Sequence, residues 1–177
     1  QGGLHNRVTN RVYLPPFTLA ECEAYLQNRG FVWDRYQMTQ CYMAFGGVPF
    51  YLKLLDPQWS WAQNVDALYF RNDGVLNNEF DELYHALFRN SEKYVAVVKA
   101  LAANREGLTR QEITKETGLS GGGLTQILRN LERCDFILGY AKFNSASKNT
   151  IYRLIDFFTL FHLRFEEGQK SRDQNYW

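Results

Sequence analysis

The stretch from residue 108 to residue 154 constrains the fold of this chain more than any other part of the sequence. Thr109 and Glu112 have the S/T-x-x-E spacing of a capping box, in which each side chain bonds the other residue's backbone N–H at a helix start. The helix that follows, RQEITKET, should end at Gly118, because glycine readily takes the left-handed conformation of a helix C-cap. Ser120 then stands where a second helix needs its N-cap.

The second helix and the segment after it complete an ordered set of elements. In GGGLTQILRNLERCDF, apolar residues recur at intervals of three and four, which predicts one buried face, formed by Leu124, Ile127, Leu128 and Leu131. Two β-like runs, Phe136–Tyr140 and Thr150–Leu154, flank a polar, turn-rich tip at 144–149. Helix, tight turn, helix and hairpin in this order predict a winged helix-turn-helix. Many DNA-binding modules use this layout to place one helix in a major groove.

The sequence between Thr18 and Phe88 has a helical pattern throughout. Pro49 lies in the first turn of a helix predicted over PFYLKLLD, where proline is favoured. The other helix boundaries are marked by capping boxes at Thr18–Glu21 and Ser60–Gln63, by starts at Asp34 and at Asn77 or Asn78, and by ends at Gly30 and Gly46-Gly47. Five helices with short connections predict a small helical bundle.

Two further helices complete the prediction. One, over 92–104, should pack behind the helix-turn-helix, and the other, over 157–167, is strongly apolar and should dock on one of the two modules. The predicted fold class is therefore mainly α: a helical bundle followed by a winged helix-turn-helix with a small β-hairpin wing.

A single strand is predicted over Thr9–Leu14, closed by Pro15-Pro16. It has no sheet to join inside this chain, because the only other predicted strands form the wing, which suggests that it is the last strand of a domain cut away. We therefore divide the chain into a remnant of that domain at 1–16, a helical domain at 17–90, the winged helix-turn-helix at 91–156, and a C-terminal helix and tail at 157–177.

Composition excludes several classes of protein. The 177 residues carry a net charge of +1, without an apolar run long enough for a membrane span and without a secretory leader pattern. The three cysteines are odd in number and far apart, which favours thiols in a reducing cytoplasm over disulfides. Neither the cysteines nor the histidines have the spacing of metal ligands, so no metal site is expected.

The order of motifs along the chain resembles a bacterial and archaeal group of P-loop ATPases. The matching elements are GGLHNR before the strand, PF-T-x-x-E at 16–21, F-GG-VPFYL at 45–52, Leu87-Phe88 ahead of Tyr94, the winged helix, and Y-R-L-x-D-x-F-x-x-F at 152–161. In these motifs the chain is similar to the archaeal-type ATPases of the AAA+-related STAND class. The resemblance runs from the first residues to about Phe165.

The resemblance implies roles for three residues. In the family, the segment corresponding to Gly47 and Pro49 belongs to a lid that closes over the adenine of bound nucleotide, and Arg7 lies near an arginine that senses the γ-phosphate. The local chemistry is compatible with this, since glycine lets another group approach the backbone and proline offers a rigid apolar ring. A Gly-Gly C-cap followed by proline is also an ordinary corner between two helices, and both interpretations stay open.

The sequence lacks the residues for ATP chemistry. It has no G-x-x-x-x-G-K-[ST] loop to cradle phosphates, and no Ser/His/Asp or Cys/His set that would make a catalytic site. We therefore expect no catalytic residues and no cofactor in this chain. The intact protein would bind ATP and magnesium through an ATPase core of the same polypeptide, upstream of this fragment. A nuclease-like domain downstream is a further feature of the group.

The winged helix carries a local excess of positive charge. Residues 91–155 hold ten Lys and Arg against six Asp and Glu, a net charge of +4, which leaves −3 for the rest of the chain. A basic patch of this kind is typical of contacts with DNA phosphates. The residues expected to face DNA are Thr125, Gln126, Arg129, Arg133 and, at the wing tip, Lys148. Three glycines at the start of the helix are poor base readers and Glu132 repels phosphate, so packing or contact with a protein partner stays open.

Two functions follow from these observations. In the first, the chain is the lid and winged helix of an ATP-binding switch, in which nucleotide clamps the lid to the core and moves the winged helix. In the second, it is a self-contained DNA-binding transcriptional regulator whose N-terminal helices bind a partner. The unpaired strand and the GGVP corner favour the first function.

Overall fold

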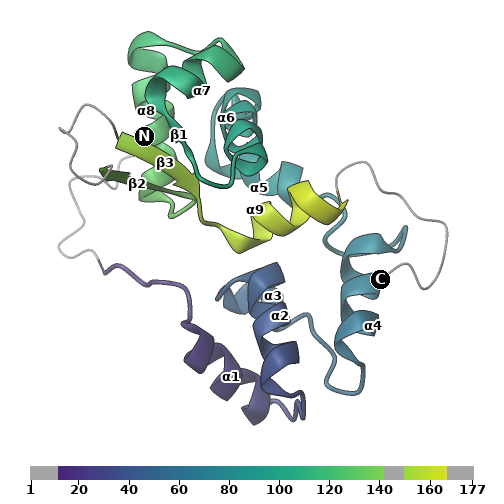
Figure 1. Ribbon diagram of the computed structural model, residues 1–177. Coiled ribbons are helices and arrows are strands. Elements are labelled where there is room, and N and C mark those ends of the chain that lie inside the picture. The colour runs from purple at the N-terminus through teal and green to yellow at the C-terminus, as the bar shows by residue number, and fades with distance from the viewer. Residues whose placement is uncertain (1–11, 142–149, 167–177) are drawn as a thin grey trace, which may run out of the picture.

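The structure is a computed structural model that describes residues 12–141 and 150–166. It is mainly helical with one small three-stranded antiparallel sheet, so the fold class predicted from the sequence is confirmed (Figure 1). Helices α1 to α4 form one part, and the winged helix-turn-helix, from α6 to β3, forms the other, with α5 packed beside α6. Helix α9 lies between them.

The first two helices start at the predicted caps. Helix α1 (Leu19–Asn28) opens with the Thr18–Glu21 capping box, and α2 (Arg35–Phe45) opens with a second box between Asp34 and Gln37. Gly30 follows the end of α1 in the left-handed region, with a φ of 89°. Both helices bury an apolar face, which includes Cys22, Leu26, Met38, Cys41 and Phe45.

Helix α3 (Pro49–Leu52) begins at Pro49 as predicted but is only four residues long, so the prediction of a helix reaching Asp56 is wrong. The cause is tertiary. The guanidinium of Arg29, at the end of α1, donates to the carbonyl oxygens of Leu52 and Leu55 at 2.6 and 3.0 Å. These carbonyls are thereby bonded by a side chain, and the chain turns away after Leu52.

The next predicted helix changes its geometry halfway. Helix α4 (Trp61–Val65) opens with the Ser60–Gln63 box and passes directly into a π-helical segment, η1 (Asp66–Phe70). The sequence signals predicted one continuous α-helix here. Helix α5 (Glu79–Leu87) starts after Asn78, whose side chain makes no capping bond. Three acidic residues lie in its first turn, where their negative charge interacts favourably with the positive end of the helix dipole.

The winged helix-turn-helix comprises α6 (Ser91–Ala103), β1 (Leu108–Thr109), α7 (Arg110–Thr117), α8 (Gly121–Arg133), β2 (Ile137–Ala141) and β3 (Thr150–Leu154). The Thr109–Glu112 box and the left-handed cap at Gly118, with a φ of 71°, form as predicted. Ser120 precedes α8 but makes no side-chain capping bond. The strand order is β1-β3-β2, with Tyr152 of β3 opposite both Leu108 and Gly139. The two-residue strand β1 was not predicted.

The last helix joins the two parts. Helix α9 (Phe157–Phe161) continues into a second π-helical segment, η3 (His162–Glu166), and packs on α2, while η3 contacts α6. Its aromatic side chains are deeply inserted: Phe158 stacks on Tyr51 at 4.7 Å, and His162 stacks on Phe80 at 4.1 Å. The predicted C-terminal helix thus contacts both modules, and one hydrophobic core runs through them.

The N-terminal segment differs from its prediction. Residues 12–14, the described part of the strand predicted over Thr9–Leu14, form no strand, and residues 9–11 lie outside the described residues. A strand needs a neighbour to bond, and the sheet of the winged helix does not supply one to this segment. In the described part of the chain, no helix combines the length and apolar character needed to cross a bilayer.

Candidate functional site

The corner between α2 and α3 contains both of the described residues that the sequence singled out for nucleotide contact, Gly47 and Pro49. Helix α2 ends at Gly46, which has a φ of 63° and is therefore the residue that needs left-handed freedom. Val48 precedes α3 without a side-chain cap, and Pro49 takes the first helical position. The conformation of the corner therefore depends on a glycine at the end of one helix and a proline at the start of the next, as its sequence suggests.

Gly47 is required for a different reason, which is space. A Cβ on Gly47 would lie 1.9 Å from the carbonyl oxygen of Phe17 and 2.6 Å from its nitrogen. The N–H of Phe17 donates to the carbonyl of Gly47 at 2.8 Å, and the hydroxyl of Tyr42 donates to the carbonyl of Phe17 at 3.2 Å. Because Gly47 has no side chain, the backbone of Phe17, just before α1, can lie directly against it. The hydrogen bond between the two residues fixes this segment to the corner.

Pro49 itself is exposed, whereas the residues around it anchor α3. The buried ring of Tyr51 stacks on Phe158 of α9, and its hydroxyl donates to a carboxylate oxygen of Glu79 at 3.1 Å. Burial, with the nearby charge of Glu79, raises the pKa of Tyr51, so this phenol stays protonated. The proline ring is therefore presented at the surface by a helix whose other side is held firmly.

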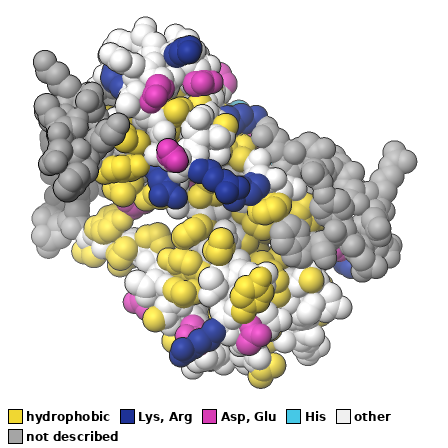
Figure 2. All heavy atoms as spheres, in the orientation of Figure 1, with side chains coloured by type: hydrophobic (Ala, Val, Ile, Leu, Met, Phe, Trp, Pro, Cys, Tyr) yellow, Lys and Arg dark blue, Asp and Glu magenta, His cyan; other side chains and the backbone are white. Residues whose placement is uncertain are grey.

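A cavity of about 630 Å³ lies beside Pro49. Its wall comes from the segment 14–17, from α3 and α5, from the end of α8 and from the start of α9. The main residues are Pro16, Phe17, Val48, Pro49, Leu83, Leu87, Cys134, Asp135, Phe136, Asp156 and Phe158. Hydrophobic side chains border the hollow between the winged helix and the helices α1 to α3 (Figure 2). The cavity is therefore mostly apolar and is shared by both parts of the molecule.

Two aspartates, Asp135 and Asp156, line this cavity, and the pKa of Asp156 is shifted. Its carboxylate caps α9 by accepting from the N–H of Thr159 at 2.7 Å. Burial raises the pKa of Asp156, and the bonds from Thr159 oppose that rise. The hydroxyl of Tyr13 donates to Asp135, another residue of the cavity wall, and this bond joins the N-terminal segment to the turn between α8 and β2.

The outward face of α8 is the candidate nucleic-acid surface. Thr125, Gln126, Arg129 and Arg133 are all exposed, opposite the buried leucines, as predicted. The amide of Gln126 donates to Asn130, and Asn130 donates to the hydroxyl of Tyr94, both at 2.7 Å, which fixes this side chain against α6. The three glycines at the start of α8 are exposed, and Cβ atoms built on them would meet nothing within 4 Å. A partner can therefore approach the first turn of α8 closely.

Two predicted site residues, Arg7 and Lys148, lie outside the described residues. Gly47 and Pro49 lie together at the corner between α2 and α3, while the other four residues lie on α8. Figure 1 shows α8 on the other side of α9 from α2 and α3. Among the residues that the structure describes, no group of three or more His, Cys, Asp or Glu is placed to hold a metal ion.

Two features of the structure, one at the site and one in α4, were missed by sequence reasoning. Asp156 stands three residues before Thr159, immediately ahead of an apolar helix, and this N-cap signal was available in the sequence. The indole N–H of Trp61 is buried and has no hydrogen-bond acceptor, and no local sequence pattern predicts such a group.

A comparison of the chain with family models, with curated proteins and with solved structures finds no match.

Proposed function

We propose that this chain is the lid and winged-helix portion of a nucleotide-operated switch of the P-loop ATPase class, related to the AAA+ and STAND proteins. The observation that carries the proposal is the position of the Gly46–Pro49 corner. On one side the corner is bonded to Phe17, which follows the N-terminal segment, and on the other side α3 packs through Tyr51 on Phe158 of α9.

This arrangement gives a path from the corner to the winged helix. Helix α9 starts three residues after the end of β3, so a displacement of α9 acts directly on the sheet. Packed elements of this kind move as units rather than deforming continuously. A group that enters the cavity beside Pro49 and favours one position of α3 would therefore shift the winged helix relative to α1 and α2.

In this proposal, the adenine of ATP lies against Val48 and Pro49, whose apolar atoms face the cavity. Gly47 holds the entering chain segment, and Arg7 contacts the γ-phosphate. An ATPase core of the same polypeptide supplies the phosphate-binding loop and the magnesium ligands that the sequence of this chain lacks. This chain contributes closure over the base and transmits the movement.

The test uses the polypeptide that joins this chain to its ATPase core. Replacing Pro49 with alanine should weaken ATP binding about 4- to 15-fold, because one or two CH₂ groups, each worth about 0.8 kcal/mol when buried, no longer touch the base. The melting temperature should stay nearly unchanged, since proline at this position is helpful rather than required. Pro57→Ala, in an exposed turn away from the cavity, is the matched control. An encoded polypeptide without a P-loop core, or an unchanged ATP dissociation constant in folded Pro49→Ala protein, would remove this function.

DNA binding by the winged helix is a second candidate, favoured by the exposed face of α8. Arg129 and Arg133 project from this face, and the first turn of the helix is open to close approach. The module has a net charge of +4, which suits contact with phosphates. This candidate applies equally to the switch and to a self-contained transcriptional regulator, and contact of the same face with a protein partner is the remaining possibility.

Fluorescence anisotropy with several DNA duplexes at low salt tests this candidate. Binding should be weak and steeply salt-dependent, and Arg129→Gln should reduce the salt slope by about 0.9, the value for a single phosphate neutralised by one cation. Lys93→Gln, which removes an exposed cation of α6, serves as the charge-matched control. A dissociation constant weaker than about 10⁻⁴ M, the weak limit of nonspecific DNA binding, would leave α8 as a packing or protein-contact helix.

A further inference from the structure

The segment that leads into α1, residues 12–17, forms part of the wall of the cavity beside Pro49. Leu14, Pro15, Pro16 and Phe17 all line this cavity. Residues 12–16 are also exposed to solvent, which shows that no other described element buries them. In Figure 1 the segment is the purple trace that runs from the side of the winged helix to α1. A single length of chain, without a second layer over it, therefore forms this part of the wall.

The sequence makes this segment stiff. Pro15 and Pro16 have fixed φ angles and no backbone N–H, and a residue that precedes a proline is restricted to extended conformations, which applies to Leu14 and to Pro15. Four residues of extended chain, from Tyr13 to Phe17, span about 12 Å at about 3.1 Å each. A rotation at one end of the segment therefore moves the other end with it.

One end of the segment is fixed at several points. The N–H of Phe17 donates to the carbonyl of Gly47 at 2.8 Å, and the hydroxyl of Tyr42 donates to the carbonyl of Phe17 at 3.2 Å. The ring of Phe17 packs on Tyr25 of α1, with 5.7 Å between the ring centres. Thr18, which follows, is the N-cap of α1. These contacts hold Phe17 on the helical part of the molecule.

The other end is held by one side-chain bond. The hydroxyl of Tyr13 donates to the carboxylate of Asp135, and both residues are exposed. Asp135 lies in the turn that follows α8, with a φ of 58°. Within the described part of the chain, residues 12–16 make no other hydrogen bond. A single bond that water can reach therefore joins this end of the segment to the winged helix.

We propose that residues 12–17 are a strap over the cavity beside Pro49, with Phe17 as its hinge and the bond from Tyr13 to Asp135 as its latch. Breaking the latch lets the strap turn about Phe17, which opens the cavity to solvent and to a ligand. Because Asp135 follows the end of α8, an occupant that displaces the strap also frees this helix from the segment before α1. The inference concerns access to the cavity and does not depend on whether the ligand is a nucleotide.

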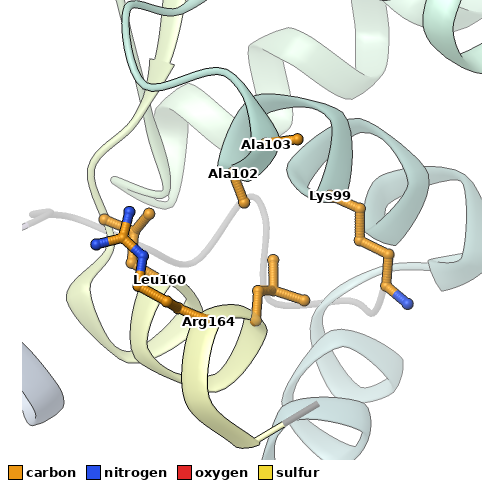
Figure 3. Close-up of a pocket in the computed structure, with 6 residues that line it drawn as sticks. Lys99, Ala102, Ala103, Leu160 and Arg164 are labelled. Carbon is orange, nitrogen blue, oxygen red and sulfur yellow. The ribbon is translucent and has the colours of Figure 1, made fainter. Parts of the chain in front are cut away.

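A second cavity, of about 410 Å³, provides an internal reference. Its described wall comes entirely from helical residues of α6, α9 and η3, which are Lys99, Ala102, Ala103, Leu160, Leu163 and Arg164 (Figure 3). None of these residues lines the cavity beside Pro49. Movement of the strap should therefore leave the reference cavity unchanged.

Methyl NMR of the whole chain with a neutral, soluble gadolinium chelate tests the strap. Val48 and Leu83 are half-buried on the wall of the cavity beside Pro49, and relaxation enhancement at their methyl groups should rise in Tyr13→Phe. The methyl groups of Ala102 and Leu163, on the reference cavity, should show no change. Tyr36→Phe, which removes the hydroxyl of an exposed tyrosine on α2, is the matched control and should leave all four residues unaffected.

Chymotrypsin measures the opening independently, because Tyr13→Phe keeps an aromatic residue after which this protease cuts. Cleavage between residues 13 and 14 should become about 2- to 12-fold faster in Tyr13→Phe and in Asp135→Gly, the range expected when one net hydrogen bond no longer holds the strap closed. Glycine suits the positive φ at position 135, and both replaced residues are exposed, so the variants should fold normally.

The double variant separates the latch from two unrelated effects. Since both changes remove the same bond, Tyr13→Phe combined with Asp135→Gly should be cleaved no faster than the faster single variant. Unchanged cleavage and unchanged relaxation in the single variants would overturn the proposal, as would additive effects of the two changes in the double variant.

Discussion

Gly47→Ala offers the sharpest test of the corner, because one methyl group decides whether the segment before α1 can stay in place. The added Cβ would lie 1.9 Å from the oxygen of Phe17, and backbone atoms rather than a flexible side chain occupy that space. Gly47 is not among the glycines with positive φ, so conformational strain contributes little. The predicted effect is therefore steric and local.

The magnitude follows from two contributions. Separation of the two segments breaks the bond from the Phe17 N–H to the Gly47 carbonyl, 2.8 Å long, which is worth about 1 kcal/mol. Forcing a methyl group into filled space costs about 1–3 kcal/mol more. We expect the free energy of unfolding to fall by about 2–4 kcal/mol. For a chain of this length each kcal/mol lowers the melting temperature by about 2–4 °C.

Urea denaturation followed by circular dichroism measures this loss, with the melting temperature as a second readout. Gly122→Ala is the matched control, because a Cβ there would meet nothing within 4 Å and alanine favours the helix by up to about 1 kcal/mol. The two glycine-to-alanine changes should therefore move stability in opposite directions. A Gly47→Ala variant within about 0.5 kcal/mol of the wild type, the usual range for a surface substitution, would refute the close approach of Phe17.

Two further predictions concern titratable groups. Burial raises the pKa of Asp156 above its usual 3.8, so the folded chain binds the carboxyl proton more tightly than the unfolded chain does. The protonated carboxyl therefore stabilises the fold below pH 3.8, and this contribution is lost as the pH rises through the folded-state pKa. The stability of Asp156→Asn relative to wild type should therefore increase between about pH 4 and pH 7 in urea titrations, and a pH-independent difference would contradict the raised pKa. Burial raises the pKa of the Cys22 thiol to about 11 and also raises the pKa of Cys41, and both side chains are buried. Partial desolvation and the charge of Asp135 raise the pKa of Cys134 as well, but this side chain is exposed to the reagent. Iodoacetamide near pH 8 should label Cys134 first in the folded chain, as mass spectrometry would show, and equal labelling of Cys41 would contradict its burial.

The sequence by itself determined the helix starts and the order of elements in the winged helix-turn-helix. The boxes at Thr18, Ser60 and Thr109 and the left-handed cap at Gly118 form as predicted, because each depends on bonds within a few residues. The buried face of α8 followed from spacing alone, since the periodicity of a helix fixes which side chains share a side.

Only the tertiary structure decided where segments distant in sequence meet. Arg29 ends α3 by bonding carbonyls 23 and 26 residues away, and Gly47 is needed because Phe17 lies against it. The short strand β1 likewise exists because it pairs with β3, more than 40 residues further along the chain. No local sequence pattern predicted the π-helical segments or the unpaired N–H of Trp61. A local sequence pattern determines bonds between near neighbours. The space around each group and its distant partners depend on how the core is assembled. The cavity beside Pro49 is lined by segments far apart in the sequence, so only the tertiary structure shows it.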